Sequence, residues 1–407
     1  DIGRVLLSLR FLAKSENTLP FSFGLAKCLT QNFIHHRKDK KQEGRLLVLT
    51  FLQKFKKTNY LKLLRKREVI LMIKPKLLKP GDTIGIISTS SPVAAICPNR
   101  FHRGVTELES MGFKVKIGKN ALKRIGHLAG TIEERLEDLH EMFQDNEVKA
   151  IINTIGGYNS HQLIEYIDYD LIKQNPKIIL GYSDFTAILL AIHKKSELIT
   201  FMGPALLPQF GEYGGMLEYT KKIFKAVLMT KNDELNIPPS TYWTSEFLAW
   251  DKEDNRPRQL TKNEGPLIIK EGKASGKILA GNMGTMLLLA GTEFLPSFDN
   301  RVLFLEEDEE EKPSTIDRYL TQLRHMGVFE KINGIVVGRF HPKIKFSQDY
   351  TFIDIICQAT KGYDFPIVYN VDFGHTDPMI TIPNGIDVEV EASNNNVNIL
   401  FRETSVQ

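Results

Sequence analysis

The chain has 407 residues, of which 42% are hydrophobic, 25% charged and 9% aromatic, and its formal net charge is +4. These values are typical of an ordinary globular protein of two or three domains, and no uncharged apolar run approaches the roughly 18 residues of a membrane-spanning helix. The three cysteines, Cys28, Cys97 and Cys357, lie far apart, which excludes a disulfide framework or a Cys-x-x-Cys site and fits a reducing compartment.

The basic excess is confined to residues 1–71, which hold 16 Lys/Arg and five Asp/Glu and carry a net charge of +11. Residues 72–407 carry −7, so the overall charge does not indicate a nucleic-acid partner. We interpret residues 1–71 as an extension outside the fold, with the folded part beginning at Met72. A transit peptide and a basic surface-binding segment are the alternatives.

Short apolar runs then alternate with amphipathic stretches as far as Met202. The predicted strands are 83–87, 113–117, 148–155, 177–180 and 198–202, and the predicted helices are 101–111, 131–143, 160–167 and 187–195. This rhythm predicts an α/β fold whose N-terminal domain, residues 72–235, is built on a doubly wound, mostly parallel sheet. Such sheets bind ligands at the carboxyl ends of their strands.

The rhythm breaks near 205–245, where a helix over 217–229 leads into two prolines, and we place the linker there. The C-terminal domain, residues 236–407, is predicted to be a β-rich α/β domain. Its expected strands are 265–269, 276–280, 301–305, 334–337 and 367–371 with a hairpin over 382–400, and its helices are 285–289 and 314–326.

The first chemical motif is Gly181-Tyr182-Ser183-Asp184 between a predicted strand and a predicted helix. A serine on a sharp strand-to-helix turn is exposed, and the next backbone N–H can face a developing oxyanion. A helix cap by Ser183 or Asp184 is the simpler interpretation of these residues alone.

The second motif is the loop Asn153 to Ser160, whose glycines Gly156 and Gly157 follow a predicted strand. Such a loop presents backbone N–H groups to an anion, but a plain turn also requires glycine.

The third motif places His375 just after a strand, between Gly374 and Pro378. Together with a serine and a carboxylate, a histidine serves as a general base. The candidate carboxylate is Glu306, which ends an apolar strand; Glu307–Glu311 read as a solvated charge run.

Other site types have no support in the sequence. There is no His-Glu-x-x-His pair or Walker phosphate loop, so we predict no metal and no cofactor. A dinucleotide-dependent enzyme is a weaker alternative because the Gly156-Gly157 loop lacks Gly-x-Gly-x-x-Gly.

Taken together, these motifs resemble the LD-carboxypeptidase family of serine peptidases, and within it the branch that contains the microcin C self-immunity protein. The resemblance runs from Met72 to about Arg402, with the motifs in the family's order. The segments that carry it are Lys79-Pro80-Gly81-Asp82, Thr154-Ile155-Gly156-Gly157, Gly181-Tyr182-Ser183-Asp184, Leu305-Glu306-Glu307 and Phe373-Gly374-His375-Thr376-Asp377-Pro378.

The resemblance implies a triad in which Ser183 is the nucleophile, His375 the base and Glu306 the group that orients the imidazole. It implies an oxyanion hole from the backbone N–H groups of Asp184 and of Gly156 or Gly157. It also implies a metal-independent, cytoplasmic enzyme that forms a homodimer.

Two departures bear on the substrate. Peptidoglycan-recycling members typically have Arg-Gly-Gly-Tyr-Gly near the position of Thr154, and they lack the insert from Tyr242 to Trp250. The insert is similar to the immunity branch, whose substrates carry an aminoacyl adenylate-like group. Trp243 and Trp250 either stack on a base or pack an interface, and Asn282 either lines the cleft or makes a turn.

We therefore expect a serine carboxypeptidase that cleaves an amide next to a terminal group of a peptidyl or aminoacyl-nucleotide substrate. The alternatives are a muramoyl-tetrapeptide LD-carboxypeptidase and a non-catalytic ligand-binding module. No nucleic-acid or membrane partner is expected.

Overall fold

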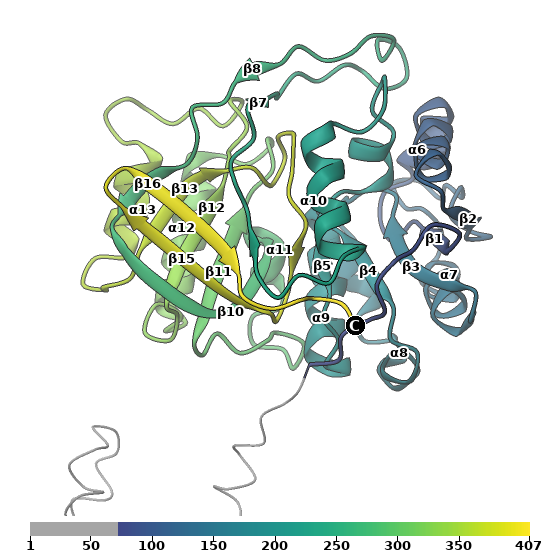
Figure 1. Ribbon diagram of the computed structural model, residues 1–407, viewed down its shortest axis with the longest axis horizontal. Helices are drawn as coiled ribbons and strands as arrows, with labels where there is room; N and C mark the ends of the chain where they lie inside the picture. The colour runs from purple at the N-terminus through teal and green to yellow at the C-terminus, as the bar shows by residue number, and fades with distance from the viewer. Residues whose placement is uncertain (1–71) are drawn as a thin grey trace, which may run out of the picture. The chain divides into compact units, whose positions relative to one another are not determined.

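The computed structural model describes residues 72–407, so the predictions for residues 1–71 lie outside the described part. Two lobes, each built on its own sheet, lie side by side (Figure 1). Each sheet has a core of parallel strands, and all the strand-end motifs recognised in the sequence lie at the carboxyl ends of these strands.

The N-terminal lobe holds a six-stranded sheet that is parallel except at one edge, where β14 pairs antiparallel with β5. In sheet order its strands are β14 (Ile382–Pro383), β5 (Phe201–Met202), β4 (Ile178–Gly181), β3 (Val148–Asn153), β1 (Thr83–Ile87) and β2 (Lys114–Ile117).

Helices cover both faces of this sheet. They are α5 (Val93–Ile96), α6 (Pro98–Ser110), α7 (Ile132–Gln144), α8 (Tyr169–Gln174), α9 (Thr186–Ser196) and α10 (Glu218–Leu228). Three short turns of other helix types are η2 (Ser160–Leu163), η3 (Ser183–Phe185) and the π-helix η4 (Leu206–Phe210). A capping box between Thr131 and Glu134 opens α7, because each side chain accepts the other residue's backbone N–H.

The C-terminal lobe holds an eight-stranded sheet with a parallel centre and antiparallel edges. In sheet order its strands are β6 (Leu235–Asn236), β16 (Asn396–Phe401), β15 (Asp387–Ser393), β10 (Gly272–Asn282), β11 (Arg301–Glu306), β12 (Gly334–Gly338), β13 (Ile367–Val371) and β9 (Leu267–Lys270). Its helices are α11 (Met283–Leu288), α12 (Pro313–His325) and α13 (Phe352–Ala359). A separate hairpin pairs β7 (Tyr242–Trp243) with β8 (Thr261–Lys262).

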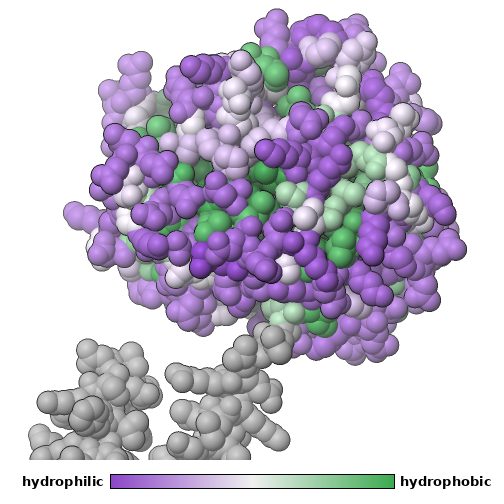
Figure 2. Space-filling model, viewed as in Figure 1, coloured by the Kyte–Doolittle hydropathy of each residue, from purple (hydrophilic) through white to green (hydrophobic). Residues whose placement is uncertain are grey.

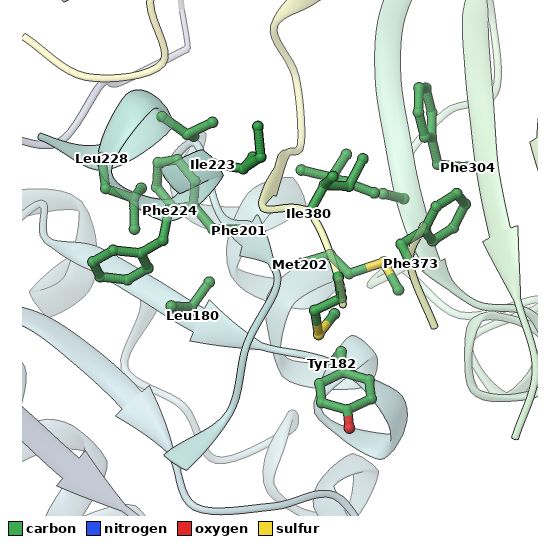
Figure 3. Packing of buried hydrophobic residues seen from close by; sticks show 14 of the residues in the cluster. Leu180, Tyr182, Phe201, Met202, Ile223, Phe224, Leu228, Phe304, Phe373 and Ile380 are labelled. Atoms are coloured by element: carbon green, nitrogen blue, oxygen red, sulfur yellow. The ribbon is translucent and has the colours of Figure 1, made fainter. Parts of the chain in front are cut away.

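Side chains that alternate along the strands enter two hydrophobic cores, and both cores are shared by the lobes. Leu180 and Phe304 belong to one core, and Ile179 and Leu303 belong to the other. Figure 3 shows part of the first core, where Met202 and Ile380 lie between residues of the two lobes. The junction between the lobes is therefore packed like a protein interior.

The expected α/β class with a parallel-rich first sheet and a β-rich second part is confirmed. Four details differ. The helix expected over 160–167 is only the short turn η2, and the presumed linker contains η4, whose five residues are all buried. The hairpin expected from 382 begins at Asp387, because Ile382–Pro383 joins the first sheet. The expected boundary at 235/236 falls inside β6.

No helix in residues 72–407 combines the length and the apolar character that a membrane crossing requires. The face in Figure 2 is mostly hydrophilic, with hydrophobic residues in small groups.

Candidate active site

Ser183 lies on a strained turn directly after β4. Its φ is +63°, a left-handed conformation that a serine adopts only when its surroundings impose it. Two glycines make the turn possible. A Cβ at Gly181 would lie 2.5 Å from the ring of Phe185, and one at Gly156 would lie 2.8 Å from Ser183 Oγ. Neither Ser183 nor Asp184 caps α9; the Asp184 carboxylate instead accepts the backbone N–H of Ser160 at 2.8 Å.

His375 and Glu306 reach Ser183 from the other lobe. Glu306 is the last residue of β11, and His375 follows β13. His375 Nε2 lies 3.1 Å from Ser183 Oγ, and His375 Nδ1 lies 2.7 Å from Glu306 Oε2. The structure therefore brings the three predicted residues into one hydrogen-bonded row.

The carboxylates beside His375 raise its pKa. Burial opposes the charged imidazolium, but Glu306, Asp308 and Glu309 outweigh burial and raise the pKa of His375 to about 9. The Glu306 side chain is 1% exposed, and its second oxygen, Oε1, has no partner among the described residues. The environment thus favours the protonated imidazole, which is the form that a general base acquires during reaction.

The Gly156-Gly157 loop lies against Ser183 from the end of β3. A Cβ added at Gly156 would also lie 3.3 Å from the backbone nitrogen of Asp184. Ser91, after β1, donates to the Gly156 carbonyl from both its hydroxyl, at 2.7 Å, and its backbone N–H, at 3.3 Å. Within residues 72–407, the Gly157 N–H donates to no protein acceptor. The peptide between the two glycines is therefore held firmly with one donor unused.

Asn282 and Glu307 are both buried, at the end of β10 and just after β11. Asn282 caps α11 by accepting the Thr285 N–H at 2.9 Å, and its contact with substrate stays a prediction. Its Nδ2 donates to Glu307 Oε2 at 3.1 Å. Glu307 is 2% exposed, so its assignment to a solvated charge run is wrong. Burial, together with the neighbouring Glu306, raises the pKa of Glu307 to about 8.

Both predicted tryptophans are half-buried and already carry a guanidinium on the ring. Arg100 lies 4.3 Å from the Trp250 ring centroid, and Arg339 lies 4.6 Å from that of Trp243. Trp250 also packs on the shared core. Trp243 lies next to Thr244, which forms a β-bridge with Asp377, two residues after His375. Trp243 is therefore close to the site, because its neighbour in sequence pairs with the histidine loop. The surroundings of Trp250 are those of a packing residue.

The sequence analysis missed four side chains that surround this site: Ser91, Gln209, Arg258 and Asp377. Asp377 stood within the motif around His375, and Ser91 follows the predicted strand 83–87, so their positions offered a signal. Gln209 and Arg258 carried no signal, because each lies in a stretch without strand or helix periodicity. No cluster of three or more His, Cys, Asp or Glu that could hold a metal ion occurs in the described range 72–407.

Two family domains match the chain: the LD-carboxypeptidase N-terminal domain over residues 84–203 and the LD-carboxypeptidase C-terminal domain over residues 275–390. The chain is 34% identical over 334 residues to the microcin C7 self-immunity protein of Escherichia coli, an alignment that covers 81% of this chain and 96% of that protein. The chain belongs to the LD-carboxypeptidase family.

Other members of the LD-carboxypeptidase family are similar at the same level. A probable murein peptide carboxypeptidase of Bacillus subtilis is 34% identical over 322 residues, covering 77% of this chain and 90% of that protein. The structure of the microcin C7 self-immunity protein in complex with aspartyl sulfamoyl adenosine matches with a TM-score of 0.77 at 34% identity, covering 82% of this chain and 100% of that one. The family and the expected class, a serine-type carboxypeptidase, are thus confirmed.

Proposed function

We propose that the protein cleaves an amide next to a terminal group through a Ser183–His375–Glu306 triad. The observation that carries the proposal is the row of contacts from Ser183 Oγ to His375 Nε2, 3.1 Å, and from His375 Nδ1 to Glu306, 2.7 Å. A neutral imidazole whose Nδ1–H donates to Glu306 turns the lone pair of Nε2 towards the serine hydroxyl.

In the proposed reaction Ser183 Oγ attacks the carbonyl carbon while its proton passes to His375 Nε2. The imidazolium then gives this proton to the leaving nitrogen as the C–N bond breaks. Water, deprotonated by the same histidine, hydrolyses the acyl-enzyme and regenerates Ser183. The strained turn at Ser183 and the buried Glu306 keep the reacting groups aligned without substrate.

The N–H groups of Asp184 and Gly157, with Gly156 as the neighbouring alternative, are the proposed oxyanion donors. Support comes from the closeness of Gly156 to both Ser183 Oγ and the Asp184 nitrogen, and from the unused Gly157 N–H. Donors fixed in advance stabilise the negative charge that develops on the substrate oxygen, and one such donor is worth about 10²–10³-fold in kcat.

The proposed substrate is a peptidyl or aminoacyl nucleotide-like molecule. The insert around Trp243 is the feature that favours it, and a relative with a similar fold binds aspartyl sulfamoyl adenosine. Trp243 is the better candidate for stacking on a base, because Trp250 packs on the shared core, whereas Trp243 is next to Thr244, which pairs with Asp377. A murein tetrapeptide is the second candidate, favoured by the relative from Bacillus subtilis.

The test offers both substrates to the full chain, as wild type and as Ser183→Ala, with products followed by mass spectrometry. Cleavage of an aminoacyl sulfamoyl adenosine alone, and by the wild type alone, supports the proposal. If only the tetrapeptide is cleaved, by loss of its terminal D-residue, the substrate is a murein peptide and not an aminoacyl nucleotide. If neither substrate is cleaved while one still binds, a ligand-binding module replaces the enzyme. We further propose that the protein is a cytoplasmic homodimer. Size-exclusion chromatography with light scattering tests whether it forms a dimer.

A further inference from the structure

The loop that carries His375 is held on both sides by an arginine–aspartate pair. Asp372 precedes the histidine, and its Oδ1 lies 2.7 Å from Nη2 of Arg339. Asp377 follows the histidine, and its Oδ2 lies 2.7 Å from Nη2 of Arg258. Arg339 belongs to the same lobe as the loop. Arg258 does not belong to a sheet of either lobe, since it comes from the segment between β7 and β8.

The segment between β7 and β8, residues 244–260, is attached to Asp377 in two independent ways. Its Arg258 binds the side chain, and its Thr244 exchanges two backbone hydrogen bonds with Asp377, with N···O distances of 2.6 and 3.0 Å. In Figure 1 the β7–β8 hairpin lies at the edge of the molecule, apart from both larger sheets. The contacts of the segment with Asp377 are polar, two through the backbone of Thr244 and one through the side chain of Arg258.

From Asp377 the contacts continue to the nucleophile. Gln209 Nε2 donates to Asp377 Oδ1 at 3.1 Å and to the Tyr182 hydroxyl at 3.2 Å. Tyr182 immediately precedes Ser183, and its ring centroid lies 5.2 Å from that of His375. Asp377 thus contacts the 244–260 segment directly, and it is linked through Gln209 to Tyr182, the residue that packs on the imidazole.

The charges in this cluster make Arg258 the shared cation. The same Nη2 lies 2.7 Å from Glu212 Oε2, and the side chains of Glu212 and Asp377 are only 3% and 10% exposed. Burying two carboxylates beside one guanidinium costs desolvation, and such pairs contribute little net stability. Their hydrogen bonds do fix the local geometry. The geometry that depends on them is that of the loop two residues from His375.

We infer that Arg258 is a positioning residue that holds the His375 loop so that the imidazole faces Ser183, and that it thereby couples residues 244–260 to the alignment of the base. This inference rests on the proposed function, because it requires His375 to activate Ser183. A substrate that shifts this segment then alters the rate of acylation as well as its own binding.

The charged or titratable groups that act on His375 are Glu306, Asp308, Glu309 and His341, together with the Tyr182 ring packed on it. Loss of Arg258 has two separable effects. A charge effect alone moves the pH midpoint of the reaction upward and leaves the plateau rate at high pH unchanged. A positioning effect lowers the plateau rate itself.

The test measures how fast a fluorophosphonate probe labels Ser183 in the full chain between pH 6 and 10. It compares wild type, Arg258→Gln, Arg258→Lys and the control Arg256→Gln. Arg256 lies in the same segment but pairs with Glu246 at an exposed position, and none of its hydrogen bonds or ion pairs involves residues 372–378. We expect the plateau rate to fall at least tenfold in Arg258→Gln, to recover in part in Arg258→Lys, and to stay within twofold of wild type in Arg256→Gln.

A plateau rate within twofold of wild type in folded Arg258→Gln overturns the inference, with folding checked by the thermal midpoint. If Arg258→Gln does not fold, Arg258→Lys decides: a plateau at least threefold below wild type supports the inference, and a smaller loss overturns it. Failure of the wild type to be labelled at Ser183 contradicts the proposed function instead, so the two failures are distinguishable.

Discussion

Ser91 fixes the carbonyl of Gly156 with two donors at once, its hydroxyl and its backbone N–H. In a planar trans peptide the C=O and N–H point in opposite directions. The Gly157 N–H therefore points away from Ser91, while the Gly156 Cα faces Ser183. This contact predetermines the orientation of a proposed oxyanion donor without touching the substrate.

Ser91→Ala removes the hydroxyl but keeps the backbone hydrogen bond. We expect kcat to fall by about tenfold, less than the 10²–10³-fold cost of losing an oxyanion donor outright, with KM within about twofold. Steady-state kinetics on the cleaved substrate measure both values. The control Ser110→Ala removes another serine hydroxyl on an exposed helix end and leaves both values unchanged. An unchanged kcat in Ser91→Ala contradicts the positioning role.

The raised pKa of His375, about 9, predicts an alkaline reaction profile. Only the neutral imidazole accepts the serine proton, and its fraction falls about tenfold for each pH unit below the pKa. The labelling rate of Ser183 with a fluorophosphonate therefore rises from pH 6, reaches its midpoint near pH 9 and levels off about one pH unit above it. Asp308→Asn removes a charge that raises this pKa, so its midpoint moves to lower pH, whereas Glu311→Gln in the same acidic run leaves the midpoint nearly unchanged. A wild-type midpoint near the ordinary 6.5 contradicts this account.

Glu307 predicts a pH-dependent contribution to stability. Its folded-state pKa, about 8, lies above the ordinary value of 4.5, so between these values the folded protein binds more protons than the unfolded chain. The contribution of Glu307 therefore falls as pH rises from about 4.5 to 8, by up to about 1.4 kcal/mol per pH unit. Glu307→Gln removes this dependence, although its single amide oxygen keeps only one of the two hydrogen bonds donated by Asn282 and Gly284, at every pH. Denaturant unfolding of wild type and Glu307→Gln at pH 5 and pH 8 measures this contribution. The prediction is refuted if the difference in unfolding free energy between the two proteins is the same at both pH values.

We expect Trp243→Ala to reduce mainly ligand affinity and Trp250→Ala to reduce mainly thermal stability. Trp243→Ala weakens binding of an aminoacyl sulfamoyl adenosine, by about 5- to 150-fold if a stack worth roughly 1–3 kcal/mol is lost. It lowers the thermal midpoint less than Trp250→Ala does, because it loses the contact with Arg339 but no part of the shared core. Trp250→Ala lowers the thermal midpoint, because it removes the ring beneath Arg100 and part of the shared core. Isothermal titration with a non-cleavable analogue and thermal unfolding separate the two. The reverse pattern would exchange their roles.

Much of this fold was predictable because its strands are short apolar runs with a helix or turn at each end. β1, β11, β12 and β13 lie within a residue of their expected bounds. The local pattern failed where pairing partners are distant in sequence. Ile382–Pro383 looks like the start of a hairpin, but it pairs with β5, some 180 residues earlier. In sequence, η4 resembles a linker because it is short and contains a proline. Its burial and its contacts with α6 are visible only in the structure.

The site was predictable to the same extent. Strand-end residues such as Ser183, Glu306 and His375 stand out, because a polar residue after a buried strand is informative in a parallel sheet. Glu307 and Arg258 do not, because each sequence context suggests a solvated charge, and only tertiary packing buries them. Burial of a charge depends on partners such as Glu212 and Asp377 that no local pattern identifies.

The central claim is that Ser183 is the nucleophile, activated by His375. The most direct measurement treats the full chain with a fluorophosphonate and follows its intact mass and peptide map, for wild type, Ser183→Ala and His375→Ala. The account predicts a single adduct on the peptide that contains Ser183 in the wild type, no adduct in Ser183→Ala, and a labelling rate at least 10³-fold lower in His375→Ala. An adduct on another residue, or equal labelling of wild type and Ser183→Ala, would contradict it.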